Sequence, residues 1–115
     1  MSEELRVAIS RSGTSYRLLT DFTFTDELLT VPAGFRTDFA SVPKWLWFVF
    51  PPVGFYAKAA LLHDWCYFCG PKLGITRWDA DAIFRRQMKR DGVGVRTRYT
   101  LWLAVRLFGH RFWSH

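Results

Sequence analysis

The first 40 residues alternate between hydrophobic and polar side chains, and this period of two is typical of β-strands. Three segments carry the pattern or are rich in β-forming residues: LRVAI (5–9), YRLLTDFTF (16–24) and LLTV (28–31). Polar stretches at 11–15 and 25–27 supply turns between these segments. The region therefore predicts a short antiparallel sheet.

After residue 40 the apolar positions recur every three or four residues, which is the spacing of an amphipathic helix. The predicted helices cover 44–50, 55–67, the stretch from Thr76 to Gly92, and 96–108. Prolines and glycines, at Pro51-Pro52 and near Gly70-Pro71, are expected to end the first two helices.

The third predicted helix has both a start signal and a core face. Thr76 and Asp79 form the pattern T-x-x-D, which resembles a capping box with Asp in the usual place of Glu. Its expected core positions are Ala80, Ile83, Phe84, Gln87 and Met88.

These segments together predict one α+β domain over residues 1–115. Residues 1–40 are expected to be mainly β and residues 41–115 mainly α. The expected architecture is a short N-terminal antiparallel β-sheet followed by three to four helices packed as a small bundle.

Composition narrows the class of protein. Half of the 115 residues are hydrophobic and 18% are aromatic, which excludes a disordered chain. The net charge of +6 suits an anionic partner, either a nucleic acid, a membrane surface or an acidic protein, without choosing among them. The N-terminus lacks the basic-then-apolar order of a signal peptide, and the longest uncharged stretch, 45–57, is too short to span a bilayer.

Candidate chemistry is concentrated in the segment LHDWCY. His63 and Tyr67 are four residues apart and share a helix face, and Asp64 lies on the same rim. Neighbouring His63 and Asp64 point in different directions and are not expected to pair directly. Asp81 on the next helix is the expected partner, because a carboxylate there can hold the second imidazole nitrogen.

Two interpretations of this group remain open. His63 can serve as a general base, with Asp64 as a metal ligand and Tyr67 as a group that orients a carboxylate. The same side chains can instead form a buried polar network that fixes the register of the helices. Asp81 can also do no more than favour the N-terminal end of its helix.

The segment GFRTDFASVP (34–43) carries small oxygen-bearing side chains. Asp38 can contribute to an oxygen-rich metal site, with Thr37 and Ser41 supporting the loop. Alternatively, Asp38 makes a turn and Ser41 caps the helix that follows. No G-x-S-x-G context supports Ser41 as a nucleophile.

Cys66 and Cys69 form C-x-x-C, and with His63 they have the spacing of a zinc half-site. No second pair of ligands follows at a suitable distance, so the preferred interpretation is that both are small core residues.

The C-terminal segment 96–115 is basic, aromatic and amphipathic. Such a composition fits a helix that lies on a membrane surface or meets another anionic partner, and it also fits a closing core helix with an arginine-rich outer edge. Nucleic acid is not an expected partner, because no recognised nucleic-acid-binding motif accompanies the charge. The residues proposed for the membrane or anionic partner are Arg96, Arg98, Arg106, Arg111, Trp102 and Trp113.

Three runs of the sequence, VPAGFRTDFASVPKWLW, PPVGFYAKAALLHDWCY and RWDADAIFRRQM, resemble a family of small uncharacterised proteins of tailed bacteriophages and prophages. This resemblance covers almost the whole chain. It implies a phage-type origin, and hence a place in the host cytoplasm or in a virion, but no settled activity. The motif positions that match are Thr37, Asp38, Ser41, Pro43, His63, Asp64, Tyr67 and Asp81.

A local pattern, H-D-x-x-Y followed by an Asp on a neighbouring helix, is similar to the core of phospholipases A2. In that family the His activates water, the adjacent Asp binds Ca²⁺ and the later Asp orients the His. The resemblance assigns these roles to His63, Asp64 and Asp81, with Tyr67 bonding to Asp81. The Gly-rich calcium loop and the disulfides of that family are absent here.

Two functions are therefore expected as alternatives. One is a Ca²⁺-dependent, phospholipase A2-like lipid hydrolase. The other is a non-catalytic phage accessory, virion or host-interaction protein.

Overall fold

The computed structural model describes residues 6–9, 16–37 and 56–113. The chain divides into two compact units, residues 1–38 and residues 39–115, each of which is described separately. This division lies close to the predicted change from mainly β to mainly α structure, and the single domain stays a prediction. The predicted helix at 44–50 lies outside the described residues.

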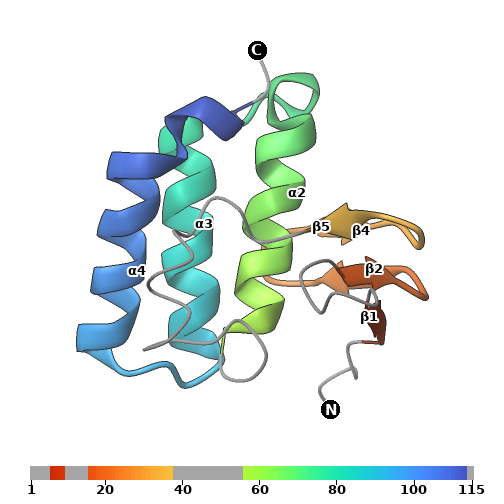
Figure 1. Ribbon diagram of the computed structural model, residues 1–115, viewed down its shortest axis with the longest axis horizontal. Helices are drawn as coiled ribbons and strands as arrows, with labels where there is room; N and C mark the ends of the chain where they lie inside the picture. Colours follow the sequence, from red (N-terminus) through yellow and green to blue (C-terminus); the bar gives the residue numbers. More distant parts are fainter. Residues whose placement is uncertain (1–5, 10–15, 38–55, 114–115) are drawn as a thin grey trace. The chain divides into compact units, whose positions relative to one another are not determined.

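The described part of the first unit forms five short strands in two antiparallel sheets, as the alternating sequence predicts. In order they are β1 (Val7–Ile9), β2 (Tyr16–Leu18), β3 (Phe22–Phe24), β4 (Leu29–Val31) and β5 (Arg36–Thr37). One sheet has the order β1-β2-β5 and the other pairs β3 with β4. Figure 1 labels four of these strands, β1, β2, β4 and β5.

Alternation along these strands places one set of side chains inside. Tyr16 and Leu18 are buried on β2, and the Arg17 between them is exposed. Phe22 and Phe24 on β3 are buried in the same way, with ring centroids 4.8 Å apart. Successive side chains of a strand point to opposite faces, so a strand with one buried and one solvent-exposed face requires this period of two.

The described part of the second unit is helical. Its elements are α2 (Ala57–Leu73), α3 (Arg77–Arg90), α4 (Val95–Phe108) and the short 3₁₀ helix η1 (Gly109–Phe112). In Figure 1, α3 stands between α2 and α4, and α3 packs against both. The α+β architecture predicted from the sequence is confirmed.

The predicted end of the second helix near Gly70-Pro71 is wrong by a few residues. Helix α2 continues through Pro71 to Leu73 and ends at Gly74, whose φ of 73° is left-handed. The backbone N–H of Gly74 bonds to the carbonyl oxygens of Gly70 and Pro71. A proline fixes φ near the helical value, so here it removes one hydrogen bond without ending the helix at once. The glycine then stops it.

The predicted capping box at the start of α3 is confirmed. The backbone N–H of Asp79 donates to the Thr76 hydroxyl and the backbone N–H of Thr76 donates to the Asp79 carboxylate, both at 3.1 Å. The predicted core face is confirmed as well, because Ala80, Ile83, Phe84, Gln87 and Met88 are all buried. Asp81 is buried among them.

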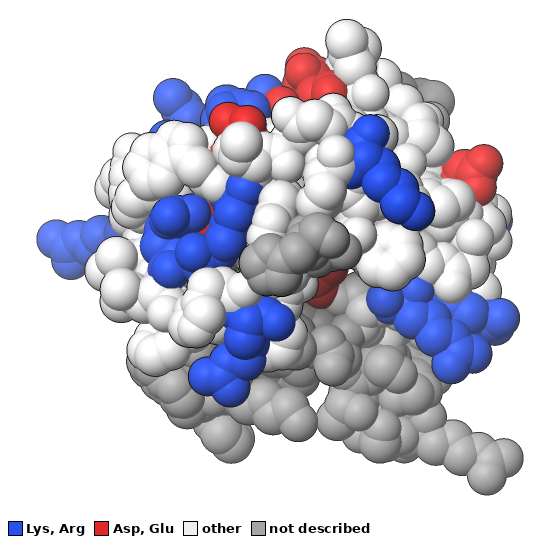
Figure 2. Space-filling view, turned by 90° about the horizontal axis from the view of Figure 1, so that it is seen from above, with Lys and Arg blue, Asp and Glu red and all other residues white. Residues whose placement is uncertain are grey.

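No helix in the described ranges combines the length and the apolar character that crossing a membrane requires. The chain has a formal net charge of +6, and this excess of basic residues is apparent on its surface (Figure 2). Figure 2 shows Lys and Arg in several separate groups on the face seen there, with fewer Asp and Glu.

Candidate functional site

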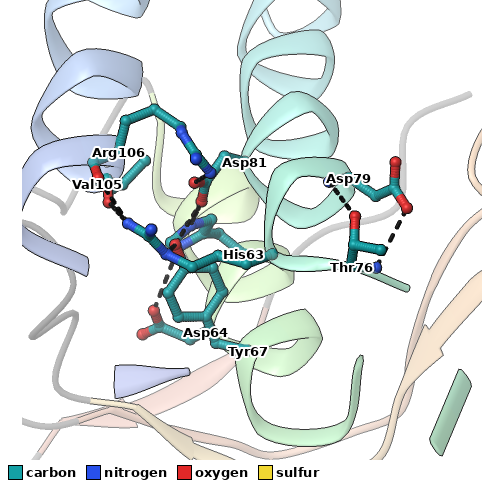
Figure 3. Close-up of polar contacts among 9 residues, drawn as sticks. His63, Asp64, Tyr67, Thr76, Asp79, Asp81, Val105 and Arg106 are labelled. Atoms are coloured by element: carbon teal, nitrogen blue, oxygen red, sulfur yellow. Dashed lines mark hydrogen bonds and ion pairs between the residues drawn. The ribbon is translucent and has the colours of Figure 1, made fainter. Parts of the chain in front are cut away.

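A buried carboxylate, Asp81 of α3, joins side chains from all three described α-helices. Its Oδ1 accepts a hydrogen bond from His63 Nε2 at 2.7 Å and another from the Tyr67 hydroxyl at 2.6 Å, both from α2. Its Oδ2 accepts from Arg106 Nη1 of α4 at 2.7 Å. Figure 3 shows these groups converging on Asp81. The predicted partnership of His63, Tyr67 and Asp81 is therefore present in the structure.

The site is sealed from solvent. Asp81 is 0% exposed, His63 1% and Tyr67 2%, whereas the Arg106 side chain is 24% exposed. Burial alone would raise the pKa of Asp81, but the hydrogen bonds from His63, Tyr67 and Arg106 outweigh it and hold that pKa below its ordinary value. Asp81 is therefore ionised at neutral pH, and each of its partners donates to it.

The bond to Asp81 defines the protonation of the imidazole. Because an ionised carboxylate only accepts, Nε2 of His63 carries the proton and Nδ1 is left as the basic atom. Burial lowers the pKa of His63, but the carboxylates of Asp64 and Asp81 more than compensate, so the pKa lies above its ordinary value.

Asp64 lies beside the other edge of the His63 ring. Its Oδ1 is 3.7 Å from His63 Nδ1, which is within ion-pair distance and longer than a hydrogen bond. The expectation that these neighbours point apart and do not pair is therefore wrong for the protonated imidazole, because its Nδ1 then faces the Asp64 carboxylate within ion-pair distance. The Asp64 side chain is 13% exposed, so it lies nearer to solvent than the imidazole.

Arg77, at the first position of α3, is a residue of this group that the sequence analysis missed. Its Nε donates to the Tyr67 hydroxyl at 3.1 Å. Its Nη2 donates to the carbonyl oxygens of Val105 and Arg106 at 2.7 Å each. The spacing of four residues between Arg77 and Asp81 puts both on one side of α3, and this was the available signal.

Arg77 also determines the direction of the Tyr67 hydroxyl. Because a guanidinium only donates, the Tyr67 oxygen accepts from Arg77 and its proton points to Asp81. Burial and the bond to Asp81 raise the pKa of Tyr67, so the phenol stays protonated.

Two of the residues that the sequence predicts to contact an anionic partner, Arg106 and Trp113, pack into or beside this network. The Arg106 guanidinium bonds to Asp81 and lies over the Trp78 ring, with 4.9 Å to the ring centroid. Trp113 is half-buried and meets the Tyr67 ring edge-on, with centroids 5.3 Å apart.

The other four of these residues remain nearer the surface. Arg96 and Arg111 are exposed. Arg98 is half-buried and donates to the Val93 carbonyl oxygen at 3.2 Å. Trp102 is half-buried, with Arg85 over its ring at 5.1 Å from the centroid. Their role toward an anionic partner stays a prediction.

The predicted metal ligands are only partly within the described residues. Asp38 and Ser41 lie outside them, and Thr37 is buried on β5. Within the described ranges, no three His, Cys, Asp or Glu side chains lie close enough together to hold a metal ion. Asp64 is therefore the predicted metal ligand whose surroundings the described residues show, and its role toward a metal stays a prediction.

Cys66 and Cys69 are both buried, and no disulfide joins them. The Cys69 thiol donates to the Trp65 carbonyl oxygen at 3.2 Å, and burial raises its pKa. A thiol with a raised pKa is a poor metal ligand and nucleophile, which agrees with a core role.

Comparison with known proteins gives a family for the chain. Residues 16–105 match the family described as protein of unknown function (DUF1353). The chain belongs to this family. The matched residues include His63, Asp64, Tyr67, Arg77 and Asp81. The match ends just before Arg106, and it also leaves out the flanking Trp113.

A relative of this DUF1353 chain is the uncharacterized protein y4jT of Sinorhizobium fredii (strain NBRC 101917 / NGR234), 36% identical over 100 residues. The alignment covers 82% of this chain and 29% of the relative, so the chain spans under a third of that protein's length. No solved structure matches the chain.

Proposed function

We propose that this DUF1353 protein is a hydrolase in which His63 acts as a general base on a phospholipid ester. The observation that carries the proposal is the 2.7 Å bond between His63 Nε2 and the buried Asp81 carboxylate. A carboxylate on one imidazole nitrogen fixes the tautomer, orients the ring and leaves the other nitrogen to accept a proton. That nitrogen, Nδ1, lies on the side of Asp64, the most solvent-accessible carboxylate of the group.

In the proposed reaction, Nδ1 of His63 takes a proton from a water molecule while the water oxygen attacks the ester carbonyl. The imidazolium that forms is stabilised by the Asp81 carboxylate. It then gives its proton to the alkoxide that leaves as the acyl–oxygen bond breaks. One water is consumed, and the products are a carboxylic acid and an alcohol.

Tyr67, Arg77 and Arg106 support this arrangement without touching substrate. Tyr67 and Arg106 hold the Asp81 carboxylate from two sides, and Arg77 holds Tyr67. A base whose orienting carboxylate is fixed in this way needs little rearrangement at the moment of reaction.

Calcium is proposed as the cofactor, with Asp64 and Asp38 among its ligands. Bound Ca²⁺ would supply positive charge to the developing oxyanion. The described residues contribute only Asp64 to such a site, so no step of the reaction is assigned to the ion.

We also propose a phage or prophage origin, and with it a place in the host cytoplasm or the virion. The support is the resemblance of TDFASVP and HDWCY, at residues 37–43 and 63–67, to proteins of tailed phages.

One observation favours a second function. His63 and Asp81 are 1% and 0% exposed, and a catalytic base must meet water and substrate. If the site never opens, these side chains form a structural network in a non-catalytic phage accessory, virion or host-interaction protein.

The test is acyl release from phosphatidylglycerol vesicles by purified protein, with Ca²⁺ and with a chelator. We expect release by the wild type, and a loss of roughly a hundredfold or more in His63→Gln, as removal of a general base requires. In Asp64→Asn, added Ca²⁺ should no longer increase the rate of acyl release. Asp79→Asn, an exposed change on the same helix as Asp81, is the matched control and should keep full activity.

Absence of acyl release from the wild type under every condition would refute the hydrolase. In that case the structural function predicts a lower melting temperature for His63→Gln and no such change for Asp64→Asn, because Asp64 lies at the edge of the network.

A further inference from the structure

Helix α4 presents a row of exposed apolar side chains at intervals of four residues. Val95 is 56% exposed, Tyr99 47%, Leu103 50% and Leu107 58%. Residues four apart lie next to each other on a helix surface, so these side chains form one continuous strip, here called the α4 stripe. Exposed leucines are ordinary when single, but a contiguous row indicates an interaction surface.

The opposite face of α4 already serves the core. Leu101, Ala104 and Val105 are the buried residues of this helix. Helix α3 packs against α4 and lies between α4 and α2. The α4 stripe is therefore additional to the packing of the helices, and the fold of the described helices does not account for it.

Positive charge surrounds the stripe. From residue 92 to the end, the chain carries arginines and no acidic residue. Arg85 of α3 lies over the Tyr99 ring at 5.4 Å from the centroid, and Arg98 lies at 5.6 Å from the same centroid. Arg96 is exposed one position after Val95.

The apolar surface continues past the end of α4. Phe108 and Phe112 are each 41% exposed, and Arg111 lies over the Phe112 ring at 5.9 Å from its centroid. Figure 2 views the molecule from the end at which α4 runs into η1, and basic groups stand there between uncharged side chains. The combination of rings, leucines and arginines thus extends from α4 into η1.

We propose that the α4 stripe and its flanking arginines dock on the surface of an anionic lipid bilayer. The headgroup region of such a bilayer takes up apolar side chains to a shallow depth and attracts arginine at the same level. A second copy of the chain fits less well, because it would bring two arginine-flanked stripes together. Nucleic acid would leave Leu103 and Leu107 without a partner of matching chemistry.

The docking surface does not depend on catalysis. His63 and Asp81 are not part of the α4 stripe, and binding is measured without any turnover. A failure of the hydrolase proposal would leave this surface intact, and a failure of docking would leave the chemistry of His63 untouched.

The experiment is co-sedimentation of the full chain with vesicles of phosphatidylglycerol and phosphatidylcholine, and with vesicles of phosphatidylcholine alone, with chelator in both. We expect tighter binding to the anionic vesicles and weaker binding at high salt. Leu103→Glu and Leu107→Glu should each weaken binding by roughly tenfold, since each removes apolar contact and adds a repelled charge. Phe68→Glu, at a position on α2 that is 64% exposed, is the matched control and should bind as the wild type does.

Circular dichroism of each variant will confirm that it is folded, which an exposed substitution should permit. The proposal is overturned if the wild type does not bind anionic vesicles, or if Leu103→Glu and Leu107→Glu bind as tightly as the wild type. Concentration-dependent dimers without vesicle binding would identify a second copy as the occupant. Retention of an oligonucleotide without vesicle binding would identify nucleic acid.

Discussion

Replacing Asp81 by Asn removes one negative charge from the centre of the network while keeping the size of the side chain. The amide oxygen can still accept from His63 and Tyr67, in the place of Oδ1. The amide NH₂ then faces Arg106 Nη1, which is 2.7 Å from Oδ2 in the native protein. Two donors at that distance repel each other, so the ion pair is lost and no hydrogen bond replaces it.

The magnitude follows from the burial of the two partners. Breaking a buried ion pair by removing one member costs about 3–5 kcal/mol of unfolding free energy. Asp81 is 0% exposed, whereas the Arg106 side chain is 24% exposed and keeps part of its hydration. We therefore expect the lower end, about 3 kcal/mol, which is a large part of the roughly 5–15 kcal/mol that stabilises an ordinary domain.

Urea denaturation followed by circular dichroism measures this loss directly, and the melting temperature should fall by roughly 10 °C. Asp79→Asn is the matched control, since it makes the same chemical change two residues earlier at an exposed position. Its cost should stay below about 1 kcal/mol. Adding Arg106→Gln to Asp81→Asn should cost little more, because the pair is already broken.

A loss below about 1 kcal/mol for Asp81→Asn would refute this account of the network. So would equal losses for Asp81→Asn and Asp79→Asn. Either result would mean that the convergence of three donors on Asp81 contributes little to the stability of the folded chain.

Substitutions at three further positions probe the helix ends by thermal melting. Thr76→Ala should lower the unfolding free energy by about 1 kcal/mol because it removes the hydroxyl of the capping box, and Thr76→Ser should restore it. Gly109→Ala should lower the melting temperature, because a Cβ there would lie 3.0 Å from the Tyr67 hydroxyl, which two hydrogen bonds hold in place. Asp91→Asn should raise the melting temperature at pH 7, since burial raises the pKa of Asp91 and its Oδ2 is buried without a hydrogen-bond partner in the described structure. A raised acid pKa costs stability only where the group is ionised, so this gain should disappear as the pH falls and Asp91 becomes protonated in both the folded and the unfolded chain. A gain that stays the same in acid would contradict the assignment.

Much of the fold could be predicted because local signals agree with it. The alternation of Tyr16, Arg17 and Leu18 predicts a strand with one buried face, and the structure buries the first and third of these. The T-x-x-D pattern at Thr76 predicts the start of α3 because the two side chains satisfy the exposed N–H groups locally. The last residue of α2 was harder to predict, since a proline weakens a helix without determining the residue at which the helix ends.

The pairing of His63 and Tyr67 with Asp81 could be predicted in the same way. Helical spacing puts His63 and Tyr67 on one face of α2, and the short connection to α3 makes the two helices antiparallel neighbours. The contact between His63 and Asp64 could not be read from spacing alone, because it depends on the rotamers of two adjacent side chains.

The partners of the two arginines could not be predicted from local spacing, because each arginine bonds to a helix other than its own. Spacing places Arg77 on the side of α3 that carries Asp81, but it does not reveal the contact with α4. Arg106 belongs to α4 but neutralises Asp81 of α3, and Arg77 belongs to α3 but binds two carbonyl oxygens at the end of α4. The two side chains therefore cross between the helices in opposite directions. The C-terminal end of a helix carries partial negative charge, so Arg77 stabilises the same turn from which Arg106 reaches Asp81. Loss of Arg77 would thus free the last turn of α4 and, by removing the bond to the Arg106 carbonyl oxygen, weaken the hold of the Arg106 side chain on Asp81.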